Sequence, residues 1–209
     1  MKLINGQKLT LITDYNIART FFIDEWIFPI LNMFSMETFL ELFTLIMLED
    51  RIVFVCENSH ILTYTIYLFA YILVRPFVYS FPVINIIPNE EFLNAPFPVV
   101  YGLLKKKKYV EDMRLVEKYS NTYVFLSPEK VELVYSESKK SLLKRKPVKL
   151  KTELSPFFRD MKKQRKTEKN SRYEIQIAEY CVMSTSEERE ISISIVEKVG
   201  RFVKEELMG

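Results

Sequence analysis

The sequence predicts an α/β fold, a layered sandwich in which helices flank a central, mostly parallel sheet. Three short runs rich in β-branched residues have the character of buried strands, at residues 51–56, 82–87 and 97–103. An apolar segment of helical length, residues 59–74, separates the first two, and a short turn of helix at residues 89–96 separates the last two. This alternation of strands and helices is typical of parallel strands joined by crossover connections.

The segments on either side of this alternation extend the same fold. Ser35 can cap a helix over residues 36–50, where apolar side chains recur at helical spacing. After the third strand, residues 105–108 (KKKK) mark an exit from the core. Two short runs, at residues 122–127 and 131–135, then predict a β-hairpin.

The C-terminal part of the chain is predicted to be helical and basic. One apolar helical face comprises Leu154, Phe157, Phe158 and Met161. Residues 173–183 fit either a strand or a helix. A final helix is expected to open with a capping box of Ser184 and Glu187, with its apolar side formed by Ile191, Ile195, Val199, Phe202 and Val203.

Length and composition favour one ordered domain over residues 1–209. Its expected parts are a central core (35–104), a strand exit with a hairpin (105–136), a basic strip (137–172) and a helical C-terminal part (173–209). Hydrophobic content of 48% excludes general disorder. The longest apolar run, residues 61–74, is short for a bilayer span, so we expect a cytoplasmic protein with no stable membrane insertion.

The residues that catalysis usually requires are sparse. His60 is the sole histidine, and Cys56 and Cys181 are far apart in the sequence. No zinc-ligand spacing, nucleotide-binding glycine loop or nucleophile-elbow motif occurs, and there are only four glycines. We therefore expect no enzyme activity, no catalytic residue, no metal site and no cofactor.

The most distinctive feature is the basic strip. Between Lys139 and Arg172 there are fourteen basic and three acidic residues, a balance of +11, whereas the whole chain carries only +3. Such a strip predicts binding to a polyanion through phosphate contacts. Aromatic residues are sparse in this strip, which argues against sequence-specific recognition of bases. We also expect no DNA partner. The candidate RNA-binding residues are Lys139, Lys140, Lys144, Arg145, Lys146, Lys149, Lys151, Arg159, Lys162, Lys163, Arg165, Lys166, Lys169 and Arg172, with Lys105, Lys106, Lys107 and Lys108 as an open addition.

The order of motifs over residues 40–102 resembles the central part of DENN domains. It comprises an apolar helix, the strand LEDRIVFV (48–55), a long apolar helix ending in RPF (75–77), the strand PVINIIP (82–88) and the strand APFPVVYG (95–102). The resemblance implies a DENN-like α/β sandwich. Family members that act as exchange factors hold a Rab GTPase between this core and a preceding longin-like lobe. Only about 35 residues precede the core (35–104) here, so we expect that lobe to be absent or vestigial.

A short DENN-like chain with a basic strip is similar in plan to the LCHN-type branch and to the dormancy factors of microsporidian ribosomes. That resemblance implies a non-catalytic hibernation factor that docks on ribosomal RNA and small-subunit proteins near the tRNA exit site (E site). Such a factor keeps idle ribosomes from translating. The alternative is a truncated DENN protein that binds or activates a Rab-type small GTPase at a membrane.

Overall fold

The computed structural model describes residues 3–4, 7–8, 26–74, 82–127, 130–136, 139–140, 143, 147–167 and 185–207, and gives no side chains for 3–4, 7–8, 165–167 and 206–207. The first four of these residues form a small antiparallel pair, β1 (Leu3–Ile4) with β2 (Gln7–Lys8).

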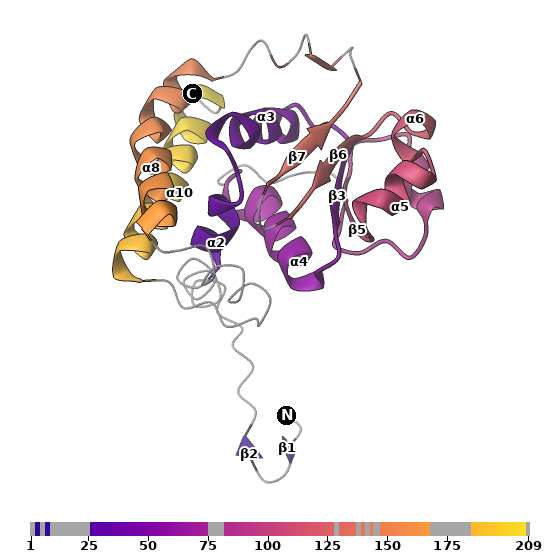
Figure 1. Ribbon diagram of the computed structural model, residues 1–209, viewed down its shortest axis with the longest axis horizontal. Coiled ribbons are helices and arrows are strands. Elements are labelled where there is room, and N and C mark those ends of the chain that lie inside the picture. Colours follow the sequence, from indigo (N-terminus) through magenta and orange to yellow (C-terminus); the bar gives the residue numbers. More distant parts are fainter. Residues whose placement is uncertain are drawn as a thin grey trace.

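A five-stranded sheet forms the centre of the molecule (Figure 1). Its strands lie in the order β4-β5-β3-β6-β7, the first four parallel and β7 antiparallel to β6. The predicted mostly parallel sheet and the predicted hairpin are therefore both confirmed. The strands are β3 (Ile52–Cys56), β4 (Val83–Ile84), β5 (Val100–Leu104), β6 (Thr122–Phe125) and β7 (Glu132–Val134).

Helices cover both faces of this sheet (Figure 1). On one face lie α2 (Ile27–Asn32), α3 (Met36–Met47) and α4 (Ser59–Tyr67), which continues as the π-helix η1 (Leu68–Ile72). The long helices α8 (Val148–Thr167) and α10 (Ser186–Leu207) pack side by side outside that layer. On the other face lie η2 (Glu90–Asn94), α5 (Lys107–Asp112) and α6 (Leu115–Lys118).

Strand β3 shows why both faces are covered. All five of its residues are buried. Because successive side chains of a strand point to opposite faces, Ile52 and Phe54 join the larger core under α3, α4 and α8. Val53 and Val55 join the smaller core under α5 and α6. A continuous apolar strand of this kind is expected where a parallel sheet is buried on both sides.

The edge of the sheet differs from the prediction. The run at residues 82–87 was expected to be a buried strand, but only Val83–Ile84 is strand, and both residues are half-buried at the edge. The chain stays close to β5 beyond this point, because Ile87 N donates to Gly102 O at 2.8 Å. A Cβ on Gly102 would lie 1.7 Å from Asn85 O, so this approach requires glycine.

Two predicted helix starts have different outcomes. Ser35 caps α3 as expected, since its side chain accepts a hydrogen bond from Thr38 N at 3.0 Å. The capping box of the last helix lies one residue later than predicted. Glu188 N donates to Thr185 Oγ1 and Thr185 N donates to Glu188 Oε2, so Glu188 takes the role predicted for Glu187. Ser184 and the ambiguous segment 173–183 lie outside the described residues.

The predicted apolar face of α8 is confirmed. Leu154, Phe158 and Met161 are buried and Phe157 packs against the same core. The ring of Phe158 lies 5.4 Å from that of Phe39 on α3, which places α8 against the inner helical layer.

Candidate functional site: a charged crevice at the carboxyl end of the sheet

The connections that follow β3 and β5 leave the sheet on opposite faces. Asn58 caps α4 after β3, accepting from His60 N and Ile61 N, and α4 packs on the larger core. After β5 the chain enters α5, whose Val110 packs in the smaller core. Strands β3 and β5 are neighbours, so two adjacent connections leave the sheet on opposite faces at this point, which we call the reversal point. Open α/β sheets bind their ligands at such a topological switch point.

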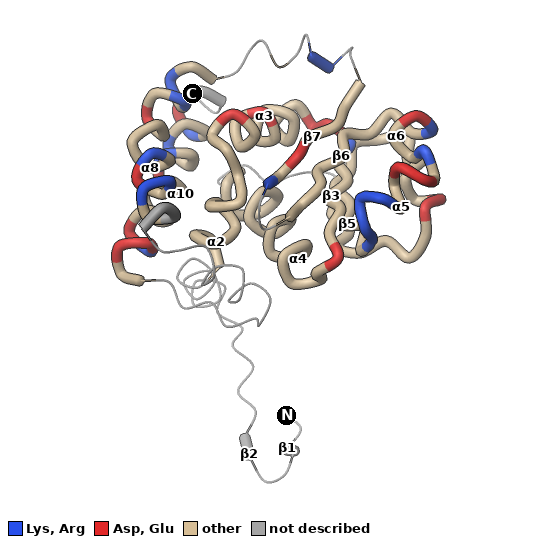
Figure 2. The backbone as a smooth tube through the Cα atoms, in the orientation of Figure 1, with Lys and Arg blue, Asp and Glu red and all other residues tan. Residues whose placement is uncertain are grey.

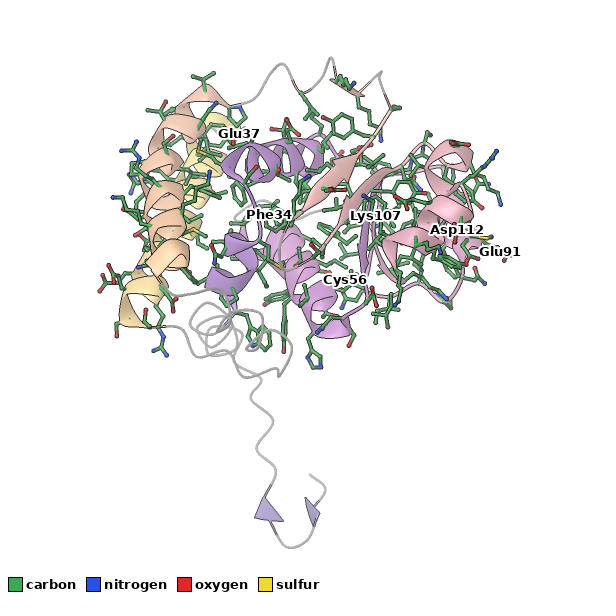
Figure 3. The ribbon with its side chains drawn as sticks, in the orientation of Figure 1. Phe34, Glu37, Cys56, Glu91, Lys107 and Asp112 are labelled. Carbon is green, nitrogen blue, oxygen red and sulfur yellow. The ribbon has the colours of Figure 1, made fainter. Side chains whose placement is uncertain are left out.

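A crevice of about 300 Å³ opens at this carboxyl end, and we call it the carboxyl-edge crevice. Its floor is apolar and includes Phe125 and Leu126. Cys56 and Lys107, labelled in Figure 3, both line it. Its charged lining residues are Glu57, Lys105, Lys107, Lys130 and Glu132.

Ion pairs join the strands and helices around the crevice. Lys107 Nζ lies 2.5 Å from Glu132 Oε2, and Lys130 Nζ lies 3.1 Å from Glu132 Oε1. The pair of Lys106 and Glu57, at 3.4 Å, joins the two loops at the reversal point. The hydrogen bond to Glu132 raises the pKa of Lys107, and the hydrogen bonds from Lys107 and then Lys130 lower the pKa of Glu132. Both shifts favour the charged forms of Lys107 and Glu132.

The thiol of Cys56 lies at the crevice but is not activated. The residue is only 6% exposed, and burial raises the pKa of the thiol. Its sulfur accepts a hydrogen bond from Asn58 N at 3.4 Å. A protonated, buried thiol is a poor nucleophile, so the crevice is suited to binding through charge and shape.

The opposite, amino end of the sheet holds a second charged cluster. Lys139 Nζ donates to Asp50 Oδ2 at 2.9 Å and to Thr122 Oγ1 at 3.2 Å. Arg51 donates to Ala95 O at 2.8 Å and to Ser120 Oγ at 2.5 Å. The side chains of Lys139 and Asp50 are 13% and 17% exposed. A contact between Lys139 and an RNA phosphate would require breaking this ion pair.

The other predicted RNA-binding residues are distributed over several environments. Basic and acidic positions interleave along α8 and α10 (Figure 2). Besides Lys139, other lysines of the basic strip pair with acids: Lys149 with Glu205, Lys151 with Glu37 and Lys163 with Asp160. Arg159 and Lys162 are exposed and have no ionic partner within the described part of the chain.

The remaining members of that set are less fully described. Lys140 is exposed. Arg165 and Lys166 lie in α8, but the structure gives no side chains for them. Lys144, Arg145, Lys146, Lys169 and Arg172 lie outside the described residues.

The four lysines at 105–108 belong to the carboxyl end and not to α8. Lys105 and Lys107 line the crevice, and Lys106 and Lys108 are exposed beside it. The Lys105 ammonium lies 4.8 Å from the centre of the Tyr109 ring. The acidic and basic partners Glu57, Lys130 and Glu132 were not identified from the sequence, since no motif marks them there.

Among the described residues, no three His, Cys, Asp or Glu side chains gather closely enough to hold a metal ion. None of the described helices has the length and apolar character needed to cross a membrane.

The segment that forms the parallel part of the sheet is similar to a known protein family. Residues 24–126 match the family model described as the DENN (AEX-3) domain. This range contains α2 to α6 and the four parallel strands, together with the carboxyl-edge crevice except for residues 127–132. No curated protein matches the chain. The match supports the assignment of residues 24–126 to the DENN-domain family.

Proposed function

We propose that this protein binds a Rab-type small GTPase through its DENN domain and regulates the nucleotide state of that GTPase. The observation that carries the proposal is the DENN-domain match over residues 24–126, because DENN domains typically engage small GTPases. The fold described for this range, a parallel sheet covered on both faces, is consistent with an intact domain core.

The carboxyl-edge crevice is the proposed contact site for the GTPase. It lies at the reversal point of the sheet, where α/β proteins bind their ligands. Its lining contains both cations and carboxylates, which favours a specific charge pattern on the partner over a general attraction. Its role does not require chemistry: the partner GTPase carries the hydrolytic site, and this protein acts by binding.

A nucleotide-release assay tests this function. A panel of Rab GTPases is loaded with a fluorescent GDP analogue, and release is followed with and without the protein in excess unlabelled GTP. We expect accelerated release for at least one member of the panel. If no GTPase of the panel shows faster release, and none is retained by the immobilised protein, the proposal is wrong.

A second function, docking on ribosomal RNA as a dormancy factor near the tRNA exit site, is favoured by a different feature. Arg159 and Lys162 project from α8 without ionic partners among the described residues, in a strip that carries +11 overall. Phosphate contacts made by six such charges would give a log–log dependence of affinity on salt of about −4 to −5.

Sedimentation of lysate through sucrose at two salt concentrations tests this second function. Retention in the ribosomal fractions at low salt, lost in the Arg159→Glu/Lys162→Glu variant, is the expected result. Equal sedimentation of the variant and the wild-type chain, or the absence of both from the ribosomal fractions, would contradict it. The two functions are separable, because the GTPase assay depends on the crevice and the sedimentation on α8.

A further inference from the structure

A second pocket, separate from the carboxyl-edge crevice except for Lys130, lies where α8 crosses the turn between α2 and α3. It measures about 200 Å³, and we call it the α8 pocket. Its floor consists of side chains that are almost fully buried, namely Met33, Phe34, Val131, Phe158 and Met161. Phe34, labelled in Figure 3, lies at that turn, between the last residue of α2 and the first of α3.

The pocket combines this apolar floor with a positive rim. Lys130 and Lys162 are on its lining, and no acidic side chain is among the described residues that line it. Lys162 has no ionic partner in the described part of the chain, and Lys130 pairs with Glu132, which lies on the crevice side. Two hydrogen bonds join the backbone of Lys130 to Ser127: Ser127 Oγ donates to Lys130 O at 2.9 Å and accepts from Lys130 N at 3.1 Å.

Size and charge together define what fits. An apolar protein cavity of about 150 Å³ holds a benzene molecule, so about 200 Å³ holds one aromatic side chain. The ammonium groups of Lys162 and Lys130 at the rim, of which Lys130 also pairs with Glu132, favour carboxylates beside that side chain. The buried floor means that the apolar part enters a site that is already formed, which lowers the ordering cost of binding.

We propose that the α8 pocket is a docking site for a partner protein that presents one bulky aromatic side chain flanked by acidic residues. The aromatic ring fills the apolar floor, and the flanking carboxylates face Lys162 and Lys130. The site does not depend on the GTPase proposal, since Lys130 is the single described residue that lines both this pocket and the carboxyl-edge crevice.

The test is an NMR titration of the ¹⁵N-labelled full chain with the unlabelled peptide Asp-Glu-Phe-Glu-Asp. We expect saturable shifts confined to amides around Met33, Thr38 and Val131. Replacing Phe by Ala in the peptide should weaken binding about tenfold or more. Shifts spread evenly over the lysines of the molecule, or no shifts at millimolar peptide, would overturn the proposal.

Three protein variants sharpen the result. Lys162→Glu should weaken binding about tenfold, whereas Lys163→Glu, which makes the same charge change at the next exposed position of α8 outside the pocket lining, should change it less than threefold. Thr38→Phe should abolish binding by filling the pocket, while the α3 cap from Ser35 to the Thr38 N–H is kept. Equal effects of Lys162→Glu and Lys163→Glu would reduce the binding to general attraction and overturn the proposal. If the wild-type chain self-associates and Thr38→Phe abolishes this self-association, the pocket binds a second copy of the chain. That result would also overturn the proposal.

Discussion

The two ends of the central sheet use the same chemical groups in opposite ways. At the amino end, Lys139 and Asp50 are 13% and 17% exposed and share further hydrogen bonds with Thr122 and Ser120. At the carboxyl end, Lys107 and Glu132 are 45% and 35% exposed and border an open crevice. Both are close ion pairs between a lysine and an acid.

The difference shows how burial decides what an ion pair does. Breaking a pair that is largely excluded from water leaves an uncompensated charge, which is strongly destabilising. An exposed pair contributes about 0–1 kcal/mol, since water and salt screen it. The amino-end pair therefore serves folding by tying the start of the basic strip to the sheet, whereas the carboxyl-end pair contributes little to folding and can open at small cost.

The largest effect is expected from closing the space between the middle of β5 and the edge segment beside it. In Gly102→Ala, the new methyl group would overlap the backbone oxygen of Asn85, which lies 1.7 Å from the Cβ position. Because backbone cannot rotate away as a side chain can, we expect a loss of at least about 3 kcal/mol of unfolding free energy. Urea denaturation measures it, and a loss below about 1 kcal/mol would show that the edge is not held as described.

The next effect contrasts the two ion pairs directly. Lys139→Met should lower the free energy of unfolding by about 2–3 kcal/mol, because it removes the ion pair of Asp50 in a site with little water. Lys107→Met should cost less than about 1 kcal/mol. The two variants are compared by urea denaturation under the same conditions, and equal losses would contradict the distinction between the two ends.

The smallest effect is a pH dependence at the carboxyl end. The pKa of Glu132 is lowered in the folded protein, so its ionised form stabilises the fold at neutral pH. That contribution is lost as the pH falls below the ordinary value of 4.5 and through the lowered folded pKa. The difference in melting temperature between the wild-type chain and Glu132→Gln should therefore shrink toward acid pH. A difference that stays constant from pH 7 to pH 3 would argue against the pairing with Lys107 and Lys130.

Much of the fold could be predicted from the sequence because the signals are local. The β-branched run of β3, the Ser35 cap and the apolar spacing of α8 each depend on a few neighbouring residues. The short helices α5 and α6 were missed. Val110 and Leu115 are the only fully buried residues in these two helices. Because charged residues surround them in the sequence, the segment was predicted to leave the core and not to form helices that pack on it.

The residues of the candidate site could not be predicted from the sequence as a group, because the topology of the sheet brings them together. Glu57, Lys107 and Glu132 are brought together only because β3, β5 and β7 end or begin at the same edge of the sheet. Lys139 shows the converse. In the sequence it is one lysine of a dense basic run, but the fold commits it to Asp50, which is 89 positions earlier.

The most direct test of the proposed GTPase binding uses two matched lysines. Lys105 and Lys118 are both exposed and both lie over a tyrosine ring, at 4.8 Å and 5.1 Å, but only Lys105 lines the crevice. The measurement is the equilibrium affinity of the immobilised protein, its Lys105→Glu variant and its Lys118→Glu variant for the Rab GTPase it binds best. We predict at least about tenfold weaker binding for Lys105→Glu and less than about twofold change for Lys118→Glu. Equal affinities of all three proteins, or no binding by the wild-type chain, would contradict the proposal.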